Sequence, residues 1–290
     1  MKVWLGILLA VIVIVVLIFF IGEKKNAKEA AKKDRKPIVF VHGFRGQARS
    51  MDTMIERFEQ KKWGRREGTC RVDAHGNVTC EKPITLTGNG APMIQVIFEN
   101  NTASIKDQGL WMKEVLKKVK ATYGNDHVNV IAHSMGGLAM MNYLMNYEGE
   151  KGTPKVDRMV TMGSPMKGIE MSRLIEQYPK AAEKKYSEAA VDLQTGSPAL
   201  EHMYKDPSAF TKISTKMLAI AGNVVDEKPK EPGSPINDHL GDGTVSVGSA
   251  WYLKKYIPNL ELKWFAVNHF NLHESPAVDA AAYQFLTDKK

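Results

Sequence analysis

Short apolar segments alternate with amphipathic segments along most of the chain, and this alternation is what most limits its fold. Strands are expected over residues 37–41, 93–98, 128–132, 158–162, 217–221 and 260–267. Helices are expected between and after them, over residues 50–62, 105–123, 136–147 and 275–286. Apolar strands without polar alternation are covered on both faces. The pattern therefore predicts an α/β fold with a mostly parallel central sheet and helices on both faces.

Two segments depart from this alternation. Residues 63–92 are rich in Gly, Thr and Asn, which predicts an irregular hairpin insertion. Residues 167–213 have a helical pattern and no apolar strand, which predicts a helical cap insertion above the sheet.

The first 22 residues form a unit of their own. No charged residue occurs from Val3 to Gly22, and a helix of that length spans the roughly 30 Å hydrocarbon layer of a bilayer. The run lacks the shorter apolar core and small-residue cleavage site of a signal peptide, although a removed signal peptide is the alternative. We expect an N-terminal transmembrane anchor over 1–22, a basic juxtamembrane linker over 23–36 and one domain over 37–290.

Basic residues concentrate next to the expected anchor. Residues 1–36 hold 8 of the 40 Lys and Arg residues but only 3 of the 32 Asp and Glu residues. Such a cluster is attracted to anionic lipid headgroups, so the membrane is an expected partner. The rest of the chain has no basic stripe, so no nucleic-acid partner is expected.

Two observations disagree about which side of the membrane the domain occupies. Most of the Lys and Arg residues of this region follow the apolar run, which favours a cytoplasmic domain. Cys70 and Cys80 instead flank the turn His75-Gly76-Asn77, where a disulfide is within reach and would indicate an oxidising compartment. Free buried thiols are the alternative. We weigh the cysteine pair more heavily and expect an extracellular domain.

The sequence VNVIAHSMGG over residues 128–137 reads as strand, sharp turn and helix, with Ser134 at the turn. In a nucleophile elbow the serine adopts a strained backbone conformation that projects its Oγ above the sheet. Ala132 and Gly136 supply the small neighbours that such a turn requires, and the helix N-terminus stabilises developing negative charge. An ordinary helix-capping serine is the alternative.

A second loop predicts hydrogen-bond donors for this serine. The first strand ends in His42-Gly43-Phe44. The backbone N–H groups of Phe44 and Met135 are the expected oxyanion hole for a tetrahedral intermediate. We interpret His42 as a structural loop histidine.

Together these motifs resemble the α/β-hydrolase superfamily. The resemblance covers residues 37–290 and rests on FVHGF, VIAHSMGG, TMGSPMKG, GDGTV and the final NHFNLHESPAV. AHSMGG and the final histidine segment are similar to small bacterial lipases, and the chain also resembles membrane-anchored cell-surface hydrolases of Gram-positive bacteria. The resemblance implies an α/β-hydrolase fold and serine chemistry, and it favours an extracellular domain. It leaves the substrate open.

The same resemblance implies an acid and a base. Asp242 in GDGTV resembles the lipase acid turn, with Asp226 and Asp238 as alternatives. His269 lies at the end of the last expected strand, immediately after Val267-Asn268, with His273 as the alternative. The order Ser134, Asp242, His269 is that of the fold's catalytic triad.

Remaining candidates are less specific. His133, Met166 and Met171 are possible acyl-pocket residues, and Ser164 is excluded as nucleophile because Pro165 follows it without an elbow of glycines. No HExxH, CxxC or carboxylate cluster predicts a metal, and no phosphate-binding loop predicts a cofactor.

The function we expect is a serine carboxylic-ester hydrolase, esterase- or lipase-like, acting on a small-molecule or lipid ester. A non-catalytic cell-surface binding module, or a thioesterase or acyltransferase using the same triad, are the alternatives.

Overall fold

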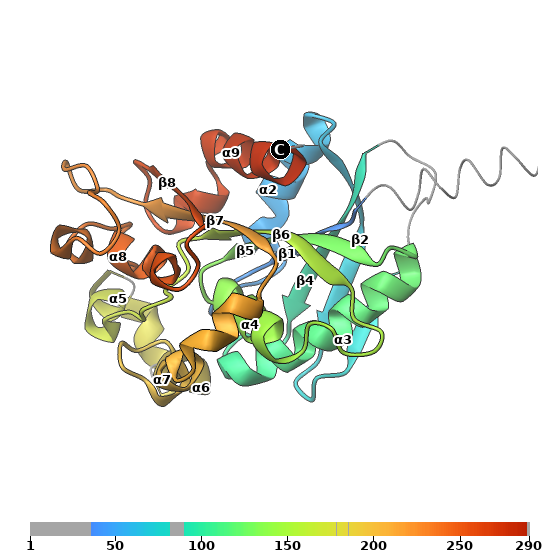
Figure 1. Ribbon diagram of the computed structural model, residues 1–290, viewed down its shortest axis with the longest axis horizontal. Coiled ribbons are helices and arrows are strands. Elements are labelled where there is room, and N and C mark those ends of the chain that lie inside the picture. Colours follow the sequence, from blue (N-terminus) through green and yellow to red (C-terminus); the bar gives the residue numbers. More distant parts are fainter. Residues whose placement is uncertain (1–35, 82–89, 178, 185, 289–290) are drawn as a thin grey trace, which may run out of the picture.

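The computed structural model describes residues 36–81, 90–177, 179–184 and 186–288. Eight strands in this part of the chain form one sheet in the order β3-β2-β4-β1-β5-β6-β7-β8 (Figure 1). All neighbouring strands run parallel except β2 and β3. The strands are β1 Ile38–Val41, β2 Gly64–Val72, β3 Val78–Cys80, β4 Ala91–Phe98, β5 His127–His133, β6 Lys155–Met162, β7 Lys216–Gly222 and β8 Glu261–Phe265. The α/β fold with a mostly parallel central sheet, which the alternation predicts, is confirmed.

Helices cover both faces of the sheet, so its apolar strands are buried on each side. The helices α2 (Arg49–Gln60) and α9 (Pro276–Thr287) pack on one face, and α3 (Ile105–Tyr123) and α4 (Met135–Asn146) pack on the other (Figure 1). Side chains alternate across β1, where Ile38 and Phe40 join the core beneath α2 and α9 while Val39 and Val41 join the other core. This is the two-sided burial expected of a parallel sheet.

Local signals fix the ends of α3. The Ser104 hydroxyl accepts a 3.0 Å hydrogen bond from the Asp107 N–H, and Gly124 ends the helix in the left-handed conformation with a φ of 61°. Both are standard helix boundary signals, and the observed bounds match the expected ones. At α9, Ser275 precedes the helix, but its side chain makes no capping hydrogen bond.

The expectation for residues 63–92 was wrong in part. Nine of these residues form β2, which pairs in parallel with β4 and carries a register shift between Arg66 and Gly68. β2 and β3 form the expected hairpin, and Cys70 and Cys80 lie opposite each other and form a disulfide. Because β2 is close to the sheet edge and only partly buried, it keeps polar side chains and lacks the apolar run of a central strand.

In the segment 167–213, most of the described residues lie in helices. These are α5 (Met171–Gln177), η1 (Pro179–Lys184), α6 (Glu188–Asp192), α7 (Pro198–Tyr204) and η2 (Pro207–Lys212). The Ala189 N–H donates to the Thr102 carbonyl at 3.1 Å, and Arg45 donates to the Lys180 carbonyl at 2.5 Å. Thr102 and Arg45 lie in the loops after β4 and β1, so the insertion contacts the carboxyl edge of the sheet.

The expected anchor over 1–22 lies outside the described residues, as does the linker up to residue 35. Among the helices that are described, none has the length and apolarity needed to cross a membrane.

Candidate active site

Ser134 occupies a sharp turn between β5 and α4. Its backbone angles, φ 54° and ψ −128°, lie outside the regions that non-glycine residues normally adopt. Its N–H donates a 2.8 Å hydrogen bond to the carbonyl of Met162 on β6, which holds the turn against the neighbouring strand. A strained serine at a strand-to-helix turn is the geometry of a nucleophile elbow.

The end of β1 crowds this turn closely. A Cβ added at Gly136 would lie 2.5 Å from the His42 carbonyl oxygen, and one added at Gly43 would lie 2.6 Å from the Cβ of Ser134. The end of β1 and the loop after it therefore require a small residue at position 136.

This close approach brings together the two expected oxyanion donors. The position of a Gly43 Cβ is 3.2 Å from the Met135 nitrogen, and Phe44 follows directly in the chain. Met135 begins α4, so its N–H has no acceptor within the helix. Among the described backbone hydrogen bonds, none comes from the Phe44 N–H. The role of these two N–H groups as an oxyanion hole stays a prediction.

Ser134, His269 and Asp242 form a continuous chain of hydrogen bonds. The Nε2 atom of His269 is 3.0 Å from the Oγ of Ser134, and its Nδ1 atom is 2.8 Å from Oδ2 of Asp242. Because a carboxylate only accepts, Nδ1–H donates to Asp242 and Nε2 is left to accept the serine proton. All three residues are buried, with exposed fractions of 8%, 4% and 1% for Ser134, His269 and Asp242.

Asp242 is fixed by its own turn. Its Oδ1 atom accepts hydrogen bonds from the N–H groups of Thr244 at 2.9 Å and Val245 at 2.7 Å. Its carbonyl accepts from the His269 N–H at 3.0 Å, which joins this turn to the loop after β8. The carboxylate therefore has little freedom to leave the imidazole.

The alternative acid, base and nucleophile residues weighed from the sequence have other surroundings. Asp226 is exposed, and Asp238 pairs with Lys167 at 2.8 Å. His273 is 3.1 Å from Glu274 through its Nδ1 atom. Ser164 is buried, and its hydroxyl has no hydrogen-bond partner among the described residues.

His42 has the structural role assigned to it. Its Nδ1–H donates to the Gly43 carbonyl at 2.9 Å, and its Nε2 atom accepts from the Phe98 N–H at 3.1 Å. Burial lowers the pKa of His42 to about 4, so the ring is neutral at neutral pH. It joins the ends of β1 and β4 beneath the oxyanion loop.

The three possible pocket residues occupy different surroundings. His133 is buried behind His269, Met166 is fully buried in the core, and Met171 is partly buried at the start of α5. Their contact with an acyl chain stays a prediction.

Gly163 and Gly222 lie against the hydrogen-bonded residues, and no sequence pattern discussed above indicated them. A Cβ at Gly163 would lie 3.0 Å from Oδ2 of Asp242 and 3.1 Å from Nδ1 of His269. A Cβ at Gly222 would lie 2.7 Å from the Cβ of Asp242. Gly163 directly follows β6 and Gly222 is the last residue of β7, so a glycine at the carboxyl end of an expected strand was the signal that could have identified them.

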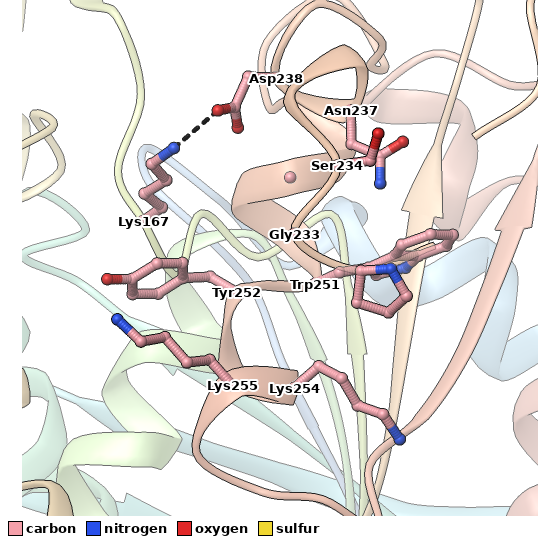
Figure 2. A pocket seen from close by; sticks show the side chains of 11 residues that line it. Lys167, Gly233, Ser234, Asn237, Asp238, Trp251, Tyr252, Lys254 and Lys255 are labelled. Carbon is pink, nitrogen blue, oxygen red and sulfur yellow. Dashed lines mark hydrogen bonds and ion pairs between the residues drawn. The ribbon is translucent and has the colours of Figure 1, made fainter. Parts of the chain in front are cut away.

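A separate cavity of about 420 Å³ lies beside η3 (Pro235–Asp238) and η4 (Tyr252–Lys255) (Figure 2). Lys167, Asp238, Tyr252 and Lys255 are among its lining residues, and none of the three hydrogen-bonded residues lines it. In the described part of the chain, no three His, Cys, Asp or Glu residues are grouped as a metal site would require.

Solved structures with the same fold extend over nearly the whole chain. The product of gene lin2722 from Listeria innocua has a TM-score of 0.69 at 25% identity, over 89% of this chain and 96% of that one. A putative cell surface hydrolase from Lactobacillus plantarum WCFS1 has a TM-score of 0.58 at 18% identity, over 87% and 91% of the two chains. The mature form of lipase BlEst2 from Bacillus licheniformis has a TM-score of 0.56 at 18% identity, over 88% and 93%.

Sequence comparison gives one curated relative and one family. Proline iminopeptidase of Lactobacillus delbrueckii subsp. lactis is 25% identical over 169 residues, which are 58% of this chain. The chain spans about half the length of that relative, 51%. The family model described as "Alpha/beta hydrolase of unknown function (DUF915)" matches residues 25–289. With the fold and the hydrogen-bonded serine already in place, this match shows that the chain belongs to the DUF915 family of α/β hydrolases.

Proposed function

We propose that the protein is a serine hydrolase that cleaves carboxylic esters through Ser134, His269 and Asp242. The observation that carries the proposal is the unbroken chain of two hydrogen bonds, 3.0 Å from Ser134 to His269 and 2.8 Å from His269 to Asp242. The likeness in fold to a bacterial lipase supports the choice of an ester over other acyl compounds.

Each group has a defined step in this reaction. His269 takes the proton of Ser134 as its Oγ attacks the ester carbonyl, then delivers that proton to the leaving alcohol. Asp242 holds the imidazole in the tautomer with Nδ1–H and stabilises the imidazolium. The N–H groups of Phe44 and Met135 stabilise the oxyanion. Water then hydrolyses the acyl-enzyme by the same steps.

The contacts of the helical insertion favour a role for it in substrate entry. Arg45 lies next to Phe44 in the oxyanion loop, and it donates to the Lys180 carbonyl and pairs with Glu183 at 3.8 Å. The segment 167–213 therefore touches the loop that carries one oxyanion donor. We propose that it acts as a cap that shapes access for the acyl chain.

The test is a covalent probe followed by kinetics on purified protein. A fluorophosphonate is expected to label wild type but not Ser134→Ala, and Ser134→Ala should lower p-nitrophenyl ester turnover by orders of magnitude. His269→Ala should be far more damaging than His273→Ala, and Asp242→Asn more damaging than Asp226→Asn. Wild-type turnover in Ser134→Ala would overturn the proposal.

A substrate series then separates the reaction classes. Esters of increasing acyl length, an acyl thioester and a proline anilide should be compared at equal enzyme concentration. The ester is expected to be the best substrate. Faster anilide cleavage would instead favour peptide chemistry, as in the proline iminopeptidase relative, and absence of any labelling would favour a non-catalytic binding module.

A further inference from the structure

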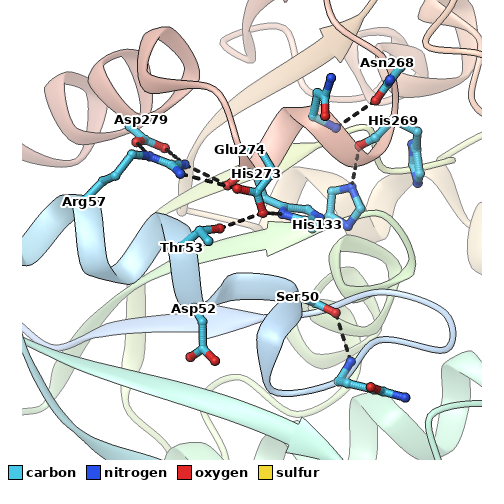
Figure 3. A network of polar contacts seen from close by, with 12 residues as sticks. Ser50, Asp52, Thr53, Arg57, His133, Asn268, His269, His273, Glu274 and Asp279 are labelled. Carbon is cyan, nitrogen blue, oxygen red and sulfur yellow. Dashed lines mark hydrogen bonds and ion pairs between the residues drawn. The ribbon is translucent and has the colours of Figure 1, made fainter.

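His133 directly precedes the nucleophile and contacts the proposed base from behind. It ends β5, and only 5% of its surface is exposed. Its Nε2–H donates a 3.0 Å hydrogen bond to the main-chain carbonyl of His269 (Figure 3). A side chain on the nucleophile strand is therefore bonded to the backbone of the loop that carries His269.

Two other imidazole rings enclose this contact. The ring centroid of His133 is 4.7 Å from that of His269 at 44°, and 4.7 Å from that of His273 at 84°. His273 is bonded to Glu274 at 3.1 Å, and Glu274 accepts a 2.6 Å hydrogen bond from Thr53 on α2. The position of the His133 ring is thus fixed on the side away from His269 as well (Figure 3).

Arg57 completes the support behind His273. Its Nη2 donates to the His273 carbonyl at 2.8 Å and to Asp279 of α9 at 3.0 Å. It also lies 3.5 Å from Glu274. Residues 270–274 are therefore held by the helix layer that contains α2 and α9.

From this geometry we propose that His133 is a positioning residue: as a neutral hydrogen-bond donor it fixes the main chain of His269, so that the imidazole reaches Ser134 and Asp242 together. The inference rests on the proposed function, and it adds a residue to that site. A hydrogen bond to the His269 backbone matters because the backbone sets the direction of the ring, and sub-ångström placement decides the efficiency of proton transfer.

The surroundings keep His133 uncharged. Burial is the first cause that lowers its pKa well below the usual value, followed by repulsion from His269 after β8, His273 in η5 (Phe270–His273) and His42 after β1. A neutral ring carries one N–H, and the His269 carbonyl requires it on Nε2. A neutral His133 favours the proposed reaction, because a positive charge on its ring, 4.7 Å from that of His269, would oppose the imidazolium that forms on His269.

Two variants of matched length separate the hydrogen bond from simple packing. His133→Gln keeps an N–H donor at about the distance of Nε2, whereas His133→Met has the same reach without a donor and packs well in cores. We expect His133→Met to lower ester kcat roughly 10- to 100-fold with KM changed less than about twofold, and His133→Gln to recover most of it. His127→Gln, at the far end of the same strand and bonded to Asp157 at 2.8 Å, is the matched control.

A spectroscopic reading does not depend on the substrate. The Nδ1–H proton of His269, bonded to Asp242, should give a downfield resonance in wild type and His133→Gln that broadens or shifts in His133→Met. Should His133→Met fail to fold, His133→Asn replaces it, since it draws the donor back by one carbon and should lose activity in the same way.

The outcomes are distinct from those that test the reaction itself. Equal activity in His133→Gln and His133→Met, whether both near wild type or both low with unchanged thermal stability, would overturn the positioning role. Failure of the fluorophosphonate to label Ser134 in wild type would overturn the proposed function instead, and the resonance would still report on the contact between His133 and His269.

Discussion

Gly163 sets how closely β6 approaches the pair of Asp242 and His269. It has a φ of +57°, which favours glycine, and a Cβ there would also lie 2.7 Å from Cδ1 of Leu272. The backbone conformation and the packing of the site both require a glycine at position 163, because any side chain there would displace both members of the hydrogen bond. The residue is therefore part of the site although it carries no reactive group.

We expect Gly163→Ala to lower ester kcat roughly 10- to 100-fold and to destabilise the fold by about 1–3 kcal/mol. The matched control is Gly124→Ala, because Gly124 has a similar φ of +61° with nothing within 4 Å of its added Cβ. The control should lose about 1 kcal/mol of stability and no activity. Kinetics with thermal melts measure both, and an equal effect of the two variants on kcat would contradict the account.

At single positions, the sequence predicted the reactive serine better than its partners. The elbow around Ser134 is a local pattern, so ten consecutive residues suffice to recognise it. His269 and His273 lie four residues apart in one segment, and local pattern alone does not choose between them. The choice depends on which side chain the fold brings to Asp242, at 2.8 Å, and this is a tertiary contact.

Among the elements, central strands were predictable and the peripheral strand β2 was not. β1, β5, β6 and β7 are mostly buried, and their observed bounds lie within three residues of the expected ones. β2 carries four Arg and Glu residues, since only part of it is buried. Its place in the sheet follows from pairing with β4, which no periodicity within β2 reveals.

The hairpin of β2 and β3 is expected to depend on its disulfide for stability but not for activity. Cys70 and Cys80 are ten positions apart, so their bond closes a short loop and contributes roughly 2–3 kcal/mol. In the sheet order, β4 and β1 separate this hairpin from β5 and Ser134. Cys70→Ala with Cys80→Ala should therefore lower the melting temperature by several degrees while ester turnover at 25 °C stays near wild type.

Reduction of the wild-type disulfide should have the same effect on the melting temperature and none on the double variant. Loss of turnover in a folded double variant would contradict the separation of hairpin and site.

Across the whole molecule, three buried histidines link stability to pH. Burial lowers the pKa of His42, His133 and His273 in the folded protein. In the unfolded chain these groups take up protons near pH 6.5. The unfolded state then binds more protons, so stability is full above pH 6.5 and falls as the pH drops from there toward the folded-state pKa values.

We expect roughly 1–2 kcal/mol of stability to be lost for His42 between pH 6.5 and pH 5, with further losses in the same direction for His133 and His273. Asp279 and Glu148, whose pKa values burial raises in the fold, favour folding at lower pH and so partly oppose this loss. Denaturant unfolding at several pH values measures the slope. His42→Gln should reduce the slope and the exposed His75→Gln should leave it unchanged; a flat profile above pH 5 in wild type would contradict the assignment.

The position of the domain relative to a membrane is the largest-scale prediction. The uncharged run from Val3 to Gly22 favours an anchor, and the basic residues that follow it favour an inward domain. The Cys70–Cys80 disulfide favours an oxidising space, hence an outward domain, which would place Ser134 outside the cell. In a bacterium expressing the full chain, protease added to intact cells should release an active fragment of residues 37–290, while fluorophosphonate that cannot enter cells should label it. If the domain stays protected until lysis and both thiols react with an alkylating agent, the orientation is inward, and the proposed chemistry at Ser134 is then tested on lysates without it.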